Sequence, residues 1–365
     1  MEKTKENTAL FEEFLREKRE QVWQVIEECL ADYRQSDGEL LRMMGQEAYL
    51  GLLDEHWRIV EDYPRRRGKY VRPALVMLMA EAMERTNAGE SGPALFTAAA
   101  MQTSEDWILI HDDLEDGSLA RRGRPALHRE VGWELAVNAG DTLHDCMHRI
   151  LSRNFEVLPI GVARRVSGEF FRMLSRTTFG QFAEIKWTLE DKEDMSEEDV
   201  LFTISGKTVY YTIAGPLRLG AILAGADEEL HRIYEFSYPL GVCFQIRDDI
   251  LDLTSDFEGQ KRQLWNDIYE GKRTLILLHL LRSASAEERR RIHTILSKPR
   301  EEKTVDEVTY IRRLMDERGS IAYAARMAEN YAQEALSLLP RLDFIRDDFR
   351  ELFRQMVLFM LERGK

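Results

Sequence analysis

Apolar residues recur at spacings of three and four along most of the chain, which is the pattern of amphipathic helices. One such stripe runs from Phe11 to Cys29, and another runs from Ile321 to Leu339. The chain has only nine prolines, and it lacks the Asn-Gly turns between alternating segments that are typical of hairpins. The pattern therefore predicts an all-α fold of roughly a dozen helices.

No Gly/Ser-rich linker or low-complexity tract interrupts the helical pattern, so we expect a single main domain. We assign residues 1–40 to an N-terminal helical extension and residues 41–365 to the main domain.

Acidic residues outnumber basic ones, with 65 Asp and Glu against 51 Lys and Arg and a formal net charge of −14. This balance argues against nucleic acid as a partner. Three widely separated cysteines argue against a disulfide framework and for a reducing compartment. The longest stretch without a charged residue, Ser91 to Ser104, is shorter than the ~18 residues that suggest a membrane span. Since the N-terminus also lacks a signal-peptide core, we expect a cytoplasmic protein without a transmembrane segment.

Two acidic clusters with the same internal spacing stand out. The aspartates of the first cluster are Asp112, Asp113 and Asp116, and those of the second are Asp248, Asp249 and Asp252. On a helix, residues i, i+1 and i+4 project from roughly one side. Three carboxylates at this spacing repel one another, and hard divalent cations such as Mg²⁺ relieve that repulsion. Mg²⁺ held in this way usually shares phosphate oxygens with a substrate, so the pair of clusters indicates a diphosphate substrate.

A chance origin has to be weighed, because the chain is rich in acidic residues. The segment Asp347-Asp348-Phe349-Arg350-Glu351 has nearly the same form, and we interpret it as a solvated helix face. A single cluster of this kind is weak evidence. Two matched clusters with basic residues around both are much stronger evidence for a site.

Basic residues follow glycine three times, at Gly68-Lys69, Gly206-Lys207 and Gly271-Lys272. Glycine allows a phosphate to approach the backbone, and lysine supplies a point charge. Arg121 and Arg122 come directly after the first acidic cluster, and arginine can bind a phosphate with two parallel hydrogen bonds. A lone Gly-Lys step is mostly a surface feature at a helix end. The arginine pair is more specific, and taken alone it fits a phosphate site and a solvated basic turn about equally well.

In combination, these residues resemble the trans-prenyl diphosphate synthases of the polyprenyl synthetase family. The resemblance runs from about Gly68 to the C-terminus, through both aspartate clusters, Gly180-Gln181, Lys207-Thr208, Phe244–Arg247 and Asp267–Thr274. It implies a single-domain isoprenoid synthase-type helical bundle around a central cavity, with residues 41–365 as the catalytic domain. It also implies a homodimer that condenses isopentenyl diphosphate with an allylic diphosphate.

The resemblance implies a role for each matching residue. The residues implied to act directly in catalysis are Asp112, Asp113, Asp116, Asp248, Asp249 and Lys207. The same aspartates, together with Asp252, are implied to bind three Mg²⁺ ions. The residues implied to bind the two diphosphates or to line the reacting centre are Lys69, Arg72, Arg121, Arg122, Thr208, Gln181, Gln245 and Lys272.

The chain departs from the family pattern at three positions, and one further position bears on product length. Arg262 stands where the family has Lys, which keeps the charge. Glu105 stands where the family usually has His or Gln, and Gln102 stands where it commonly has Glu. A carboxylate at position 105 would repel isopentenyl diphosphate unless it is protonated or paired. Trp107 and Ile108 lie five and four residues before Asp112, about 7.5 Å of helix rise at most. The resemblance therefore implies that Trp107 forms a floor, with geranylgeranyl diphosphate as the product and farnesyl diphosphate as the next candidate.

Two other functions stay open at this point. A class I terpene cyclase shares the first aspartate motif, but the intact second cluster argues against it. A non-catalytic subunit of a heteromeric prenyl diphosphate synthase would generally have lost one cluster, and both are whole here.

Overall fold

The computed structural model describes residues 7–83, 92–192, 194–254 and 264–362. The α-helices in chain order are α2 (Ala9–Met43), α3 (Leu50–Val60), α4 (Asp62–Arg66), α5 (Val71–Ala82), α6 (Gly92–Glu115), α7 (Leu127–Val131), α8 (Trp133–Ser152), α9 (Asn154–Val157), α10 (Ile160–Leu189), α11 (Glu197–Ile204), α12 (Gly215–Leu223), α13 (Leu230–Thr254), α14 (Asn266–Glu270), α15 (Leu275–Ser283), α16 (Ala286–Leu296), α17 (Val305–Glu317), α18 (Ser320–Leu338) and α19 (Arg350–Glu362). Short 3₁₀ helices are η1 (Glu47–Tyr49), η3 (Asp227–Glu229), η4 (Arg300–Glu302), η5 (Leu339–Arg341) and η6 (Asp347–Phe349). The predicted all-α fold is confirmed.

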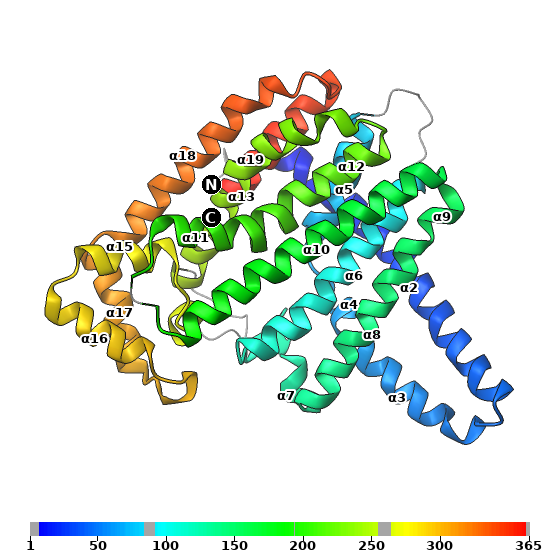
Figure 1. Ribbon diagram of the computed structural model, residues 1–365, viewed down its shortest axis with the longest axis horizontal. Helices are drawn as coiled ribbons and strands as arrows, with labels where there is room; N and C mark the ends of the chain where they lie inside the picture. Colours follow the sequence, from blue (N-terminus) through cyan, green and yellow to red (C-terminus); the bar gives the residue numbers. More distant parts are fainter. Residues whose placement is uncertain (1–6, 84–91, 193, 255–263, 363–365) are drawn as a thin grey trace.

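The long helices pack side by side around α6, α10 and α13. Helix α6 packs along α5 and α8, and α13 packs along α18 and η2. Helix α2 and helix α3 leave the bundle together and form an antiparallel pair at one corner of the molecule, whereas α15, α16 and α17 form the opposite end (Figure 1). None of the helices in the described ranges has the length and apolar character needed to cross a bilayer.

The predicted apolar stripes lie in the interior. The stripe that begins at Phe11 forms the buried side of α2, and the one within Ile321–Leu339 packs α18 through Ala324 and Ala328. Helix α2 contributes to both hydrophobic cores, with Phe11 in one and Ile26 in the other. Helix α2 also runs across residue 40, where we predict the boundary between the N-terminal extension and the main domain. That boundary stays a prediction.

Two local features depart from regular α-helix. Strands β1 (Ala120–Arg121) and β2 (Arg124–Pro125) form a short antiparallel pair that the sequence pattern did not indicate. The segment η2 (Ser205–Ala214) is π-helical and continues α11 into α12. Stretches of π-helix are rare and occur frequently at functional sites, and both features here carry basic residues singled out by the sequence.

Candidate active site

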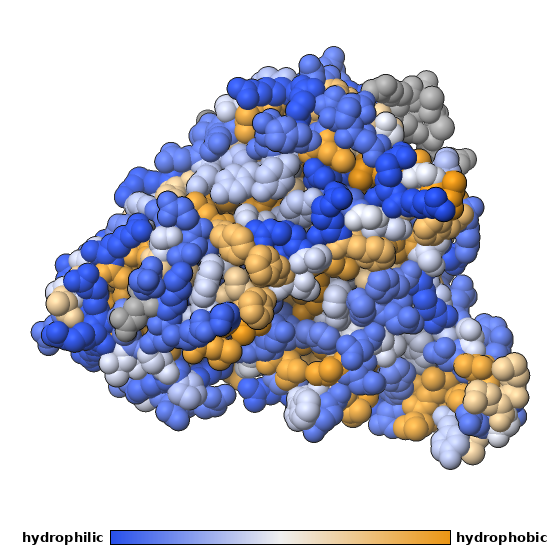
Figure 2. Space-filling model, in the orientation of Figure 1, coloured by the Kyte–Doolittle hydropathy of each residue, from blue (hydrophilic) through white to orange (hydrophobic). Residues whose placement is uncertain are grey.

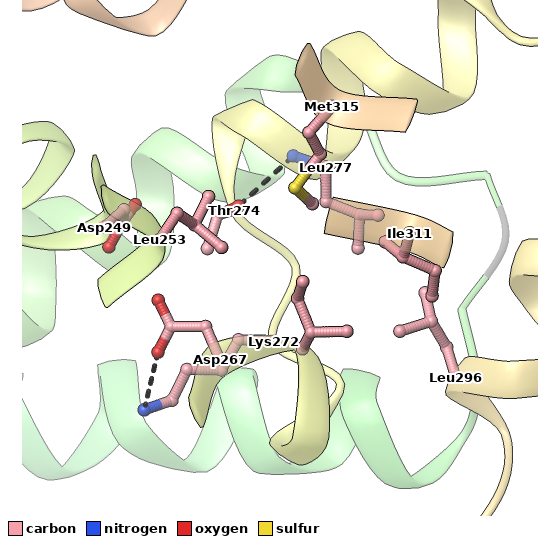
Figure 3. Close-up of a pocket in the computed structure, with 10 residues that line it drawn as sticks. Asp249, Leu253, Asp267, Lys272, Thr274, Leu277, Leu296, Ile311 and Met315 are labelled. Carbon is pink, nitrogen blue, oxygen red and sulfur yellow. Dashed lines mark hydrogen bonds and ion pairs between the residues drawn. The ribbon is translucent and has the colours of Figure 1, made fainter. Parts of the chain in front are cut away.

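The two aspartate clusters lie at the C-terminal ends of α6 and α13, and basic side chains join them. The Lys272 ammonium is 3.1 Å from a carboxylate oxygen of Asp116 and 3.7 Å from one of Asp267. Asp249 and Lys272 line one small pocket together with Asp267 (Figure 3). Apolar side chains of Leu277, Ile311 and Met315 close the other side of this pocket. Segments more than a hundred residues apart therefore place Asp116 of the first cluster in contact with Lys272 and Asp249 of the second cluster in a pocket that Lys272 also lines.

Asp112 is held by three polar side chains. The Lys207 ammonium is 3.4 Å from its carboxylate, the Gln181 amide donates to it at 3.2 Å, and Arg121 lies at 3.7 Å. Burial disfavours the charged form, but Lys207, Lys272 and Arg121 outweigh this effect and lower the pKa of Asp112. Asp112 is therefore a carboxylate ready to accept a cation.

Asp113 has a different environment from its neighbours. Its side chain is fully buried, and both of its oxygens accept hydrogen bonds from Arg121 Nε, at 3.0 and 2.9 Å. The Tyr63 hydroxyl donates a further hydrogen bond of 2.5 Å to it. The structure thus ties Asp113 to protein donors. Asp116 follows the end of α6, and its backbone N–H donates to the Asp112 carbonyl oxygen at 2.9 Å, which continues the helical i, i+4 spacing.

A tight turn sets the positions of Arg121 and Arg122. The two residues between β1 and β2 are Arg122 and Gly123, with φ values of 51° and 78°. Left-handed φ at both central residues is the geometry of a type I′ hairpin turn, in which glycine is favoured at the second position. Arg121 then reaches Asp113, and Arg122 donates to Asp106 at 2.8 Å.

In the second cluster, Asp249 is buried and accepts a hydrogen bond of 2.7 Å from the Gln245 amide. The Thr208 hydroxyl in turn donates to Gln245 Oε1 at 2.5 Å. Asp252 accepts from the backbone N–H groups of Asn266 and Asp267, at 3.2 and 3.0 Å, and so fixes the start of α14. Asp248 lies beside them on α13 and is exposed.

Lys207 reaches the site because two helices approach closely at glycines. A Cβ atom on Gly180 of α10 would lie 2.8 Å from the backbone nitrogen of Lys207 and 3.2 Å from the backbone carbonyl carbon of Gly206. Real Cβ atoms do not tolerate the first of these distances, so Gly180 allows the contact between α10 and η2. The Lys207 ammonium then lies between Asp112 and Glu184, 2.6 Å from the latter.

The residues expected to bind isopentenyl diphosphate lie at the start of α5 and in the β1–β2 turn. Lys69 is exposed, whereas Arg72 and Arg122 are partly buried. Glu105 of α6 lies 3.1 Å from Arg72 and 3.7 Å from Arg122. Both arginines are thus close to an acidic partner.

Trp107 and Ile108 are partly buried on α6 and pack against the second core. The Trp107 ring contacts the His144 ring of α8 at a centroid distance of 4.2 Å. His144 in turn lies 3.2 Å from His148, measured between the Nε2 atoms. Trp107 is therefore braced from the neighbouring helix.

Sequence reasoning missed three residues that complete the polar network. Glu184 pairs with Lys207, and Glu270 lies 2.7 Å from the Lys272 ammonium. The spacing of Glu184 three residues after Gln181 on one helical face could have indicated it. Tyr63 contacts Asp113 only through the tertiary fold, so no local signal marks it.

The carboxylates fit a hard divalent cation. Burial, with repulsion between the neighbouring acids Asp248 and Asp249, raises the pKa of Asp249 to about 7, and burial also raises that of Asp116 to about 7. A divalent cation offsets this repulsion, and carboxylate oxygen is the ligand that Mg²⁺ prefers. Within the described ranges, no three His, Cys, Asp or Glu side chains converge as a ready-made metal site. Separated carboxylates suit Mg²⁺, which usually keeps several waters and binds substrate phosphates.

Comparisons of the sequence and of the fold with known proteins point to the same family. The sequence model of the polyprenyl synthetase family matches residues 55–315. A geranylgeranyl diphosphate synthase of Methanosarcina mazei is 32% identical over 302 residues, which cover 81% of this chain and 86% of the relative. A geranylfarnesyl diphosphate synthase of Aeropyrum pernix is 29% identical over 303 residues, covering 82% and 91%. The crystal structure of a geranylgeranyl pyrophosphate synthase from Corynebacterium glutamicum, complexed with isoprenyl diphosphate and magnesium, has the same fold, with a TM-score of 0.82 at 23% identity and coverage of 94% and 99%.

Proposed function

The chain belongs to the polyprenyl synthetase family and is a prenyltransferase, and from that premise we propose which reaction it catalyses and how. It condenses isopentenyl diphosphate with an allylic diphosphate and makes geranylgeranyl diphosphate, with farnesyl diphosphate as the next candidate. The observation that supports this proposal is that Lys272 contacts Asp116 of the first cluster and lines one pocket with Asp249 of the second.

The allylic diphosphate binds between the two clusters. Asp112, Asp116, Asp248 and Asp249, with Asp252 through water, would hold three Mg²⁺ ions, which supply positive charge to the departing diphosphate. Lys207 and Lys272 already lie beside these carboxylates, so their ammonium groups are placed to contact the same diphosphate as its charge grows. Asp113 is better placed to orient Arg121, since Arg121 and Tyr63 occupy its oxygens.

Ionisation leaves a positive charge on the allylic carbon, and neutral polar groups face that region. Gln181, Gln245 and Thr208 present oxygen atoms near the first and second clusters without adding a competing nucleophile. The double bond of isopentenyl diphosphate, held by Lys69, Arg72 and Arg122, then attacks the cation. The released diphosphate takes the proton that is lost, so no side chain has to act as the base.

The names of two relatives support a product of this size range, since one makes geranylgeranyl and the other geranylfarnesyl diphosphate. In this chain the bulky Trp107 ring below the first cluster limits the growing tail, with Ile108 beside it.

Incubation of the purified chain with Mg²⁺, isopentenyl diphosphate and each allylic primer, followed by chromatography, tests the proposal. Geranylgeranyl diphosphate is the expected product. Release of a cyclic hydrocarbon would instead support a terpene cyclase. An absence of turnover without a second protein would support a non-catalytic subunit.

The chain forms a homodimer through α10, and four exposed apolar residues support this proposal. Five large apolar residues of α10 are exposed, and Phe179 lies apart from the other four, which are Ile160, Phe171, Phe182 and Leu189. Their spacing places them in a stripe about 40° wide on an α-helix. Figure 2 shows apolar side chains gathered along the course of α10 on this face of the molecule. Exposed apolar surface of this extent is typical of a protein interface.

Cytoplasmic localisation stays a prediction.

Phe182→Asp is expected to convert the dimer into a monomer, because a charge would be buried in the interface without a partner. Sedimentation velocity measures the change. Leu52→Asp, on the exposed corner helix α3, is the matched control and should remain dimeric. A wild-type chain that sediments as a monomer would contradict the proposal.

A further inference from the structure

Glu105 occupies the centre of the basic group assigned to isopentenyl diphosphate. A single carboxylate oxygen, Oε1, lies 3.1 Å from Arg72 Nη1 and 3.7 Å from Arg122 Nη2. All three side chains are largely withdrawn from solvent, with 14 to 22% of each exposed. Arg72 is the nearer partner of Glu105, whereas Arg122 also donates a hydrogen bond of 2.8 Å to the buried Asp106. Since screening by water is weak in such a place, Glu105 attracts both arginines.

The polar groups around this pair are incompletely satisfied within the protein. Gln102, one turn before Glu105 on α6, is fully buried, and neither atom of its amide has a hydrogen-bond partner. Glu105 Oε2, Arg72 Nε and Arg122 Nη2 are also buried without a hydrogen bond. Buried polar groups in native proteins are almost always paired, so a cluster of four such side chains indicates a place where a polar ligand binds.

The backbone around the cluster is strained as well. Arg67 and Tyr70, which precede α5, have φ values of 49° and 58°, in the left-handed region that non-glycine residues seldom adopt. Strain of this kind persists only where the surrounding structure enforces it, and it concentrates at ligand sites. The fold therefore imposes the turn that leads into α5, the helix that carries Arg72.

We propose that Glu105 is an internal counter-ion that competes with isopentenyl diphosphate for Arg72 and Arg122 and thereby sets the affinity of the enzyme for this substrate. The inference rests on the proposed function. The incoming diphosphate carries the same sign of charge as Glu105 and needs the same two guanidinium groups. Binding therefore requires that Arg72 turns from Glu105 to the diphosphate, and the like charge that remains beside Arg122 opposes it.

The allylic diphosphate is not affected in this way. Its proposed cationic partners, Lys207 and Lys272, pair with other acids, namely Glu184 and Glu270. Glu105 therefore weakens one of two chemically similar diphosphate sites and leaves the other unchanged.

The test compares Glu105→Gln, which keeps the size and removes the charge, with the wild-type enzyme. The KM for isopentenyl diphosphate should fall at least about tenfold, because the like-charge repulsion is removed. The KM for the allylic diphosphate should stay within about twofold, since none of its cationic partners contacts Glu105. Titration calorimetry with isopentenyl diphosphate alone should show the same fall in Kd without any turnover. Glu156→Gln, which removes an exposed acid paired with Arg153 on α9, is the matched control and should change neither constant.

Glu105→Ala is measured in parallel, and thermal unfolding shows whether each variant is folded. If Glu105→Gln does not fold, the Kd of Glu105→Ala for isopentenyl diphosphate, measured by calorimetry, decides the role of Glu105. An unchanged or weaker affinity for isopentenyl diphosphate in the folded variant, with condensation intact, would overturn the role of Glu105 and leave the proposed function standing. A wild-type chain that forms no prenyl product would defeat the proposed function, and the Kd comparison would still decide the role of Glu105.

Discussion

Asp112→Asn is expected to lower kcat by about a hundred- to a thousand-fold while the protein stays folded. The asparagine keeps the size of the side chain and the hydrogen bond from Gln181, but it removes a negative charge that the surrounding cations stabilise. It binds a divalent cation far more weakly than a carboxylate does, so the charge on the departing diphosphate would lose its stabilisation. Steady-state kinetics with a fixed allylic primer measures the loss.

The chain supplies a matched control for this prediction. Asp347 lies in an acidic cluster that looks similar in the sequence, but it is exposed on η6 and pairs with Arg350. Asp347→Asn should leave kcat unchanged. Asp249→Asn should cost about as much as Asp112→Asn, and the double variant little more, since the two clusters act on one diphosphate. Equal, small effects of Asp112→Asn and Asp347→Asn would contradict the assignment of the site.

Trp107→Ala is expected to shift the main product to a longer prenyl chain. The indole ring is the largest side chain near the proposed end of the tail, and its removal opens space into which a further isoprene unit can grow. The ring contacts His144, so His144→Ala should shift the products in the same direction but less far. Chromatography of the dephosphorylated products measures the distribution.

Trp133→Ala is the control for this change, since it removes an exposed indole from α8 and should leave the products unaltered. Unchanged chain length in Trp107→Ala, with turnover retained, would remove Trp107 from its proposed role. A lower rate with the same product would assign it to packing alone.

The sequence predicts which residue types make up this site better than it predicts which side chains contact one another. The aspartates of α6 and α13 could be singled out because a helix places residues i, i+1 and i+4 on one side, which is a local property. We predicted that the two clusters share one ligand because they match, whereas the position of Lys272 beside Asp116 depends on the packing of distant segments. Periodicity predicted the helices for the same local reason.

Other features of the site arise only in the tertiary structure. Glu105 was noted as an acid in an unfavourable position, and the structure gives its partners, Arg72 and Arg122. Asp113 was expected to bind metal with its neighbours, but its ties to Arg121 and Tyr63 depend on a turn between two-residue strands. The π-helical geometry of η2 was not indicated either, because the close approach at Gly180 is not visible in a helical pattern.

The most direct test of the central claim, that both aspartate clusters act on one diphosphate through Mg²⁺, is a condensation assay at controlled concentrations of free divalent ion. The purified enzyme is first treated with excess EDTA, and product formation is then followed as Mg²⁺ is restored. The account predicts no measurable product in EDTA and full recovery on addition of Mg²⁺, with a much higher Mg²⁺ requirement in Asp249→Asn. Undiminished turnover after all divalent ions have been removed would contradict it.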